Sequence, residues 1–183
     1  MAATYQAGRI PAERTGIPAA AGRTTAAAYV LAILRVVIGF TFLWAFFDKV
    51  FGFGYATPAA KSWLNGGSPT KGFLSGSEGP FAGIYHHLAG TGFANWAFML
   101  GLLGIGAALV LGIGMRVAGV AGVLLYLMMW AVVLPPATNP VVDDHIIGAL
   151  AVAALVLSGA GDTLGLGRRW KRQPIVENHP WLI

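Results

Sequence analysis

Long apolar stretches separated by short polar segments dominate the hydrophobic pattern of the chain. The first stretch, residues 26–47, contains a single charge, Arg35, and ends at the pair Asp48-Lys49. At about 1.5 Å of rise per residue, a helix of this length crosses a hydrocarbon layer of about 30 Å. The pattern predicts four transmembrane helices, and the other three stretches are residues 96–114, 117–134 and 141–159.

Residues 48–95, between the first two stretches, form a connection far longer than a helical hairpin needs. Long loops in compact proteins usually carry function or lack structure. This one contains two apolar patterns that follow a proline and end near a glycine, AAKSWL at 59–64 and FAGIYHHLA at 81–89. We expect both to form interfacial helices on the outer membrane surface, with Trp63, Tyr85 and Trp96 at headgroup depth.

Small residues along the second stretch indicate how the helices pack. Gly104, Ala108 and Gly112 are spaced by four, a pattern typical of close helix–helix contact in membranes. We expect this stripe to face a neighbouring helix.

Composition supports a membrane protein. Of the 183 residues, 56% are hydrophobic and 10% are charged, and the mean hydropathy is +0.68. Soluble domains carry about 25% charged residues. The predicted fold class is an all-α integral membrane protein, a four-transmembrane-helix bundle with short interfacial helices in its long first loop. Residues 26–160 form the membrane domain, 1–25 a flexible N-terminal tail and 161–183 a basic C-terminal tail.

The distribution of charge predicts the orientation of the chain. With four spans, the side that holds both termini carries eight lysines and arginines, and the other side carries three. The positive-inside rule then places both termini in the cytoplasm, for a multi-pass protein of the plasma or inner membrane. We read the net charge of +5 as this topology signal, and expect lipid and a protein subunit or second copy as partners, but no nucleic acid.

Several cofactor classes find no support in the sequence. The absence of cysteine excludes disulfides, thiolate zinc sites and cysteine-ligated iron–sulfur clusters. The chain has no P-loop and no dinucleotide fingerprint. The spans also offer no two facing histidines for a haem. We therefore expect no haem, flavin, iron–sulfur cluster or nucleotide. We also expect no metal site, although His86, His87, Asp144 and His145 supply candidate ligand types without a motif spacing.

Arg35 is the residue of the first stretch whose insertion into a membrane costs the most free energy. A charge within a span costs about 3 kcal/mol, so it usually faces other protein or a wet cavity. A functional role and a structural role, in which Arg35 satisfies backbone carbonyls, both stay open. Lys49, fourteen positions on, falls on the same helix face together with Phe42 and Phe46, whereas Asp48 falls on the opposite side with Trp44.

Polar residues at the start of the last stretch are expected at the level of Asp48-Lys49. Asp144 and His145 combine a carboxylate with a side chain that transfers protons near neutral pH. The His86-His87 pair of the outer loop is positioned to close over them. As an alternative, all of these are charges that mark helix ends at the membrane surface.

Two segments resemble a known family. WAFFDKVFGFGYATPAAKSWLNGGSPTKGFL, at 44–74, and DDHIIGALAVAAL, at 143–155, are similar to the DoxX/DoxD family of four-helix membrane proteins. That family includes the DoxD-type subunit of thiosulfate:quinone oxidoreductase, and the resemblance extends over about residues 27–170. It implies a membrane subunit linked to the quinone-dependent oxidation of a sulfur compound, with quinone as cofactor, but it supplies no catalytic residues.

These observations give a candidate quinone site near the outer leaflet. The candidate catalytic residues are Arg35, Asp48, Lys49, Asp144 and His145, and the candidate quinone contacts are Arg35, Phe42, Trp44, Phe46 and His145. Two alternatives stay open. In a non-catalytic anchor or assembly subunit of a larger redox complex, these charges satisfy one another; in a small-molecule carrier, a polar path reaches the cytoplasmic side.

Overall fold

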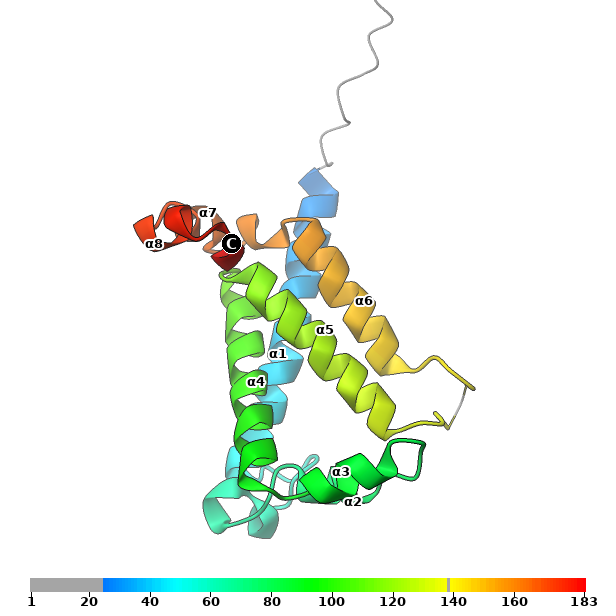
Figure 1. Cartoon of the computed structure of the whole chain (residues 1–183). Helices are drawn as coiled ribbons and strands as arrows, with labels where there is room; N and C mark the ends of the chain where they lie inside the picture. Colours follow the sequence, from blue (N-terminus) through cyan, green and yellow to red (C-terminus); the bar gives the residue numbers. More distant parts are fainter. Residues whose placement is uncertain (1–24, 138) are drawn as a thin grey trace, which may run out of the picture.

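The computed structural model describes residues 25–137 and 139–183, and all regular structure within these ranges is helical. Four helices form the body: α1 (Thr25–Phe51), α4 (Gly92–Leu111), α5 (Met115–Val132) and α6 (Asp144–Leu157). They pack mainly as two pairs, α1 with α4 and α5 with α6. Figure 1 shows that α4 and α5 are close at one end and diverge toward the other, where the short helices α2 (Lys71–Ser75) and α3 (Ala82–Leu88) lie.

Three helices are long and apolar enough to cross a membrane, namely Ala26–Phe51, Gly92–Leu111 and Met115–Val132. This agrees with the predicted helical membrane protein. The helix at the predicted fourth span, 141–159, is shorter than predicted: α6 has 14 residues, a length of about 21 Å. Its start is set by Asp143, whose carboxylate accepts hydrogen bonds from the backbone N–H groups of His145 and Ile146.

The other helix boundaries differ from the prediction for local reasons. α1 continues to Phe51, so Asp48 and Lys49 lie within the helix and not in the outer loop. α4 starts at Gly92, before the predicted 96, because the Thr91 hydroxyl accepts a hydrogen bond from the N–H of Ala94. The predicted N-terminal tail, 1–25, lies outside the described residues except for Thr25.

The outer loop is structured, but not as two helices alone. The predicted helix at 81–89 is α3. The predicted helix at 59–64 is instead two 3-10 turns, Ala59–Lys61 and Trp63–Asn65, because Ser62 between them has an extended backbone with φ −64° and ψ 153°. Helix α2 was not predicted. Trp63 and Trp96 contact each other edge to face, with ring centroids 4.8 Å apart.

The close contact between α1 and α4 uses different glycines from those predicted. A Cβ on Gly106 would lie 2.8 Å from Cγ of Leu43, and one on Gly39 would lie 2.9 Å from Cβ of Leu109. The prediction for Gly104 is wrong, since a Cβ there meets no atom within 4 Å. Gly112 ends α4 in the left-handed conformation, with φ 74°.

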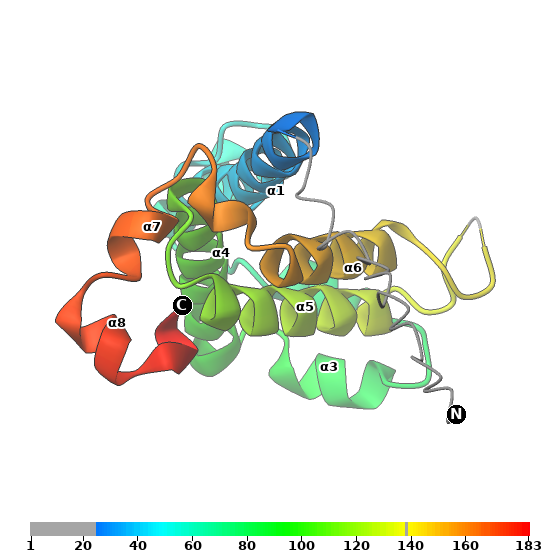
Figure 2. The same cartoon turned by 90° about the horizontal axis from the view of Figure 1, so that it is seen from above.

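The predicted C-terminal tail is folded onto the bundle. We call residues 160–183 the C-terminal foot; it contains α7 (Gly167–Trp170) and α8 (Pro174–Asn178). The backbone N–H of Arg116, at the start of α5, donates to the carbonyl of Ile183 at 2.7 Å, and the Arg116 guanidinium donates to the carbonyl of Pro180 at 2.7 Å. Figure 1 shows the foot at the same end of the bundle as the start of α1, and Figure 2 shows it extending to one side, next to α4.

Candidate functional site

Arg35 is fully buried and bonds only to backbone carbonyls. Its Nη1 donates to the carbonyls of Leu109 and Val110, the latter at 2.9 Å, and its Nη2 donates to those of Thr163 at 3.4 Å and Leu164 at 2.8 Å. The first two carbonyls belong to the last turn of α4, where a helix has no internal donors. Arg35 therefore joins α1 to the end of α4 and to the foot, as the structural alternative expects.

Asp48 is buried and holds the turn that follows α1. Its carboxylate accepts hydrogen bonds from the backbone N–H of Tyr55 at 3.4 Å and of Ala56 at 3.0 Å. Trp44 packs against the same turn, with ring centroids 5.1 Å from Tyr55 and 5.7 Å from Phe53. Both candidates stabilise local structure.

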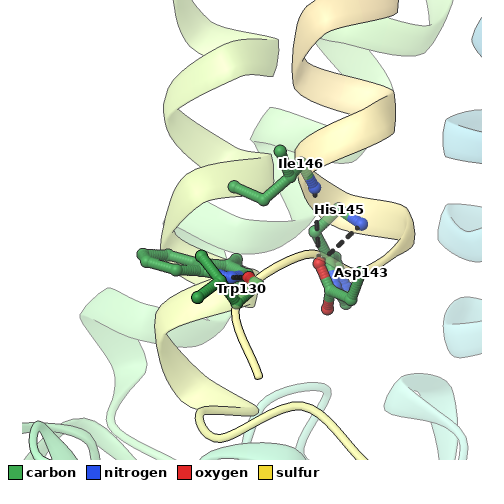
Figure 3. A network of polar contacts seen from close by, with 5 residues as sticks. Trp130, Asp143, His145 and Ile146 are labelled. Atoms are coloured by element: carbon green, nitrogen blue, oxygen red, sulfur yellow. Dashed lines mark hydrogen bonds and ion pairs between the residues drawn. The ribbon is translucent and has the colours of Figure 1, made fainter. Parts of the chain in front are cut away.

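His145 is paired with a carboxylate that was not among the candidates. Its Nδ1 lies 2.7 Å from Oδ2 of Asp143 (Figure 3), whereas the predicted Asp144 is exposed. Burial alone would raise the pKa of Asp143. That pKa is nevertheless below its ordinary value, because the carboxylate accepts hydrogen bonds from the His145 ring and from the backbone N–H groups of Ile146 and His145, and because the charge of His145 attracts it. The sequence signal was available, because an aspartate before a helix is a typical N-cap.

The predicted residues do not all meet at one place, although Phe42 and His145 both contact the ring of Tyr126, with ring centroids 5.1 Å and 6.3 Å from it. Arg35 and Asp48 lie thirteen positions apart on α1, about 20 Å. Phe42 is buried in the core, where its ring lies 5.1 Å from that of Tyr126, and Phe46 packs against the same core. The histidines of α3 have local partners, His86 the carbonyl of Ser77 and His87 that of Gly83. Within residues 25–137 and 139–183, no group of three potential ligands is placed to hold a metal ion.

A cavity of about 430 Å³ lies between α4 and α5 at the end where they diverge, under α2 and α3. Of the candidate residues, only Lys49 lines it. Phe93, Leu124 and Met128 line the cavity and are more than half exposed, so it opens on the outer surface of the helices. The lining also includes Thr70, Tyr85, Phe98 and Gly101.

Lys49 supplies the free polar group of this cavity. Its Nζ lies 5.8 Å from the centroid of the Phe98 ring, within the range of a cation–π contact. The ion pairs of the described ranges are His145 with Asp143 and Lys171 with Asp162, so Lys49 has no ion-pair partner there. The other polar side chains are engaged: the Thr70 hydroxyl donates to Asn95 at 2.7 Å, and the Tyr85 hydroxyl donates to the carbonyl of Met128 at 3.2 Å.

Tyr85 keeps its proton in this setting. Burial raises the pKa of its phenol, which favours the neutral hydroxyl that donates to Met128. The bond joins α3 to α5 and fixes the position of α3 over the cavity. The sequence prediction placed Tyr85 at the membrane surface; no sequence signal indicated its partner on α5.

The chain has no match among known protein-family models, curated proteins or solved structures. The resemblance to the DoxX/DoxD family therefore stays a prediction.

Proposed function

We propose that the protein is a membrane subunit that binds a quinone in the cavity between α4 and α5 and takes part in the quinone-dependent oxidation of a sulfur compound. The observation that carries the proposal is an apolar cavity whose one free polar group is the ammonium of Lys49. The sulfur compound rests on the DoxX/DoxD resemblance alone.

The cavity fits a quinone in size and chemistry. Its volume of about 430 Å³ lies within the range of about 300–1,000 Å³ that is common for small-molecule sites. Apolar walls suit the ring and an isoprenoid tail, and the opening between α4 and α5 suits entry from the bilayer. A bound quinone supplies two-electron, two-proton redox chemistry.

In this proposal the residues of the chain bind and orient the ligand. Lys49 donates a hydrogen bond to a carbonyl oxygen of the head group, and the Phe98 ring steadies its ammonium. Tyr85 and Thr70 hold α3 and the segment before α2 in place, which keeps water away from the head group. Electrons come from a partner protein that oxidises the sulfur compound, because the chain has no motif for a redox centre of its own.

The proposed topology has four spans, with α6 as a short fourth one. It packs beside α5, and a short span is accommodated by local thinning of the bilayer. Both termini then lie in the cytoplasm, and the cavity lies in the outer half of the plasma or inner membrane.

A second candidate is a non-catalytic anchor or assembly subunit of a larger redox complex. The observation that favours it is the use of both terminal nitrogens of Arg35 and of the Asp48 carboxylate in hydrogen bonds to the backbone, which leaves the buried Nε of Arg35 as its one donor without a partner among the described residues. In that case the cavity holds ordinary lipid.

The test for quinone binding is a pair of lysine variants. Lys49→Met should lower the affinity of the purified protein for ubiquinone or menaquinone by about tenfold, since a charge-assisted hydrogen bond contributes about 1.5 kcal/mol or more. Lys61→Met, which removes a charge from an exposed loop position, should bind as the wild type does. Titration in detergent, with fluorescence quenching as the readout, gives both values.

A second pair of variants tests the place of the ligand. Gly101 lines the cavity, where a Cβ meets only Leu125 at 3.8 Å, whereas Gly104 is exposed on the same helix. Gly101→Leu should fill the cavity and abolish quinone binding, and Gly104→Leu should not. Equal binding by wild type, Lys49→Met and Gly101→Leu would leave the anchor as the better description.

A further inference from the structure

We propose that the C-terminal foot is a binding site for anionic phospholipid headgroups. This inference does not depend on the quinone site, which lies at the other end of the bundle. It rests on three properties of the foot: unpaired arginines, a fixed place beside the ends of two spans, and exposed apolar side chains.

The foot carries a cluster of unpaired positive charge. Arg168, Arg169 and Arg172 are exposed, and none takes part in an ion pair of the described residues. Lys171 differs, since its Nζ lies 2.7 Å from a carboxylate oxygen of Asp162. The other acidic residue of the foot is Glu177, which is exposed and has no ion pair within those ranges either.

Hydrogen bonds hold the foot at the membrane boundary. α4 ends at Leu111 and α5 begins at Met115, so the turn between them marks the edge of two membrane-crossing helices. The foot is tied to this turn through both bonds of Arg116, and the N–H of Leu166 donates to the carbonyl of Leu111 at 2.8 Å. The exposed arginines are therefore held near the depth of the headgroups.

Exposed apolar side chains accompany the charges. Ile175 is 59% exposed and Trp181 is 61% exposed, although the segment is otherwise anchored by the buried Val176. Tryptophan is enriched at headgroup depth, and a segment that combines basic and apolar side chains is typical of interfacial elements. Such a composition fits a lipid surface better than bulk water.

The chemistry of the cluster favours an anionic lipid over a zwitterionic one. Guanidinium groups bind phosphate in a bidentate geometry, and the choline ammonium of a zwitterionic lipid repels them, whereas an anionic headgroup keeps its net negative charge. A negative membrane surface also attracts each nearby arginine by about 1 kcal/mol, or about fivefold in affinity. The proposed orientation puts the foot on the cytoplasmic leaflet, where anionic lipids are concentrated.

Native mass spectrometry of the full chain in detergent tests this site, with phosphatidylglycerol and phosphatidylcholine of identical acyl chains as probes. Arg168→Gln/Arg169→Gln should bind phosphatidylglycerol at least about tenfold more weakly than the wild type, the loss expected for one charge-assisted hydrogen bond, with a smaller change for phosphatidylcholine. The matched control, Lys61→Gln/Lys71→Gln, removes two exposed charges from the outer loop and should bind as the wild type does. Arg168→Lys/Arg169→Lys should restore most of the affinity.

Two outcomes would overturn the proposal. One is phosphatidylglycerol affinity that is equal in the wild type and in Arg168→Gln/Arg169→Gln. If an acidic protein then copurifies with the wild type and not with this variant, the foot binds that protein and not lipid. The other is an equal loss in the outer-loop control, which would show attraction to net charge instead of a site. Because the substituted side chains are exposed and make no side-chain hydrogen bond among the described residues, both variants should elute as the wild type does in size-exclusion chromatography.

Discussion

Arg35 shows how a buried charge is accommodated in an apolar bundle. Its guanidinium meets four backbone carbonyls, two from the end of α4 and two from Thr163 and Leu164. Buried carbonyls need a donor, and at the end of a helix, where the backbone supplies none, a side chain can provide it. The residue that looked most functional in the sequence thus has contacts that support a structural role.

Replacement of Arg35 should therefore reduce stability. Arg35→Leu leaves several buried carbonyls without donors, at about 1–3 kcal/mol each, and we expect a lower melting temperature and reduced accumulation in the membrane. Arg35→Lys, which keeps one donor group, should be intermediate. Thermal melting in detergent measures both. Normal stability of Arg35→Leu, combined with lost quinone binding, would contradict this view and restore the functional interpretation.

The start of α6 depends on one aspartate. Asp143 caps the helix and accepts a hydrogen bond from the His145 ring, and the exposed Asp144 beside it provides a matched control. We expect Asp143→Ala to lower stability by about 1 kcal/mol, and Asp144→Ala to have less effect. Denaturation monitored by circular dichroism distinguishes the two variants.

The same cap gives a pH dependence with a defined sign. The pKa of Asp143 is lowered in the folded protein, so its carboxylate stabilises the fold above the ordinary aspartate pKa of about 4. This contribution is lost as the pH falls through the lowered pKa. Wild-type stability should therefore fall more steeply than that of Asp143→Ala below about pH 4. Parallel stability curves for the two proteins would contradict the assignment.

The protein as a whole has the start of α1 and the foot at one end and α2 and α3 at the other (Figure 1). Divergence of α4 from α5 toward the second end creates the cavity there. The bundle thus separates the cavity at one end from the basic foot at the other. This separation makes the orientation in the membrane directly measurable.

Single cysteines can report that orientation, because the native chain has none. In intact cells, a membrane-impermeant maleimide should label Lys61→Cys in the outer loop and should leave Arg169→Cys in the foot unlabelled. Lysed cells should show labelling of both variants. Labelling of both in intact cells would mean that α6 does not cross the membrane and that the foot lies outside.

The sequence by itself determined the features that depend on local pattern. Apolar length predicted three helices that are long and apolar enough to cross a membrane, and the proline and glycine around 81–89 predicted α3. It also placed Arg35 and Lys49 on one face of α1, and both contact α4 in the structure. Each of these follows from helix geometry and from the hydrophobic effect within a short window of residues.

The tertiary structure alone decided which polar groups meet. The partners of Arg35 lie 74 to 129 positions away in the chain, and the bond from Tyr85 to Met128 depends on the docking of α3 on α5. The cavity beside Lys49 exists because α4 and α5 diverge from a close contact at Gly122, where a Cβ would lie 3.3 Å from Cγ2 of Ile105. Such contacts depend on packing among distant segments, which local hydrophobic pattern does not encode.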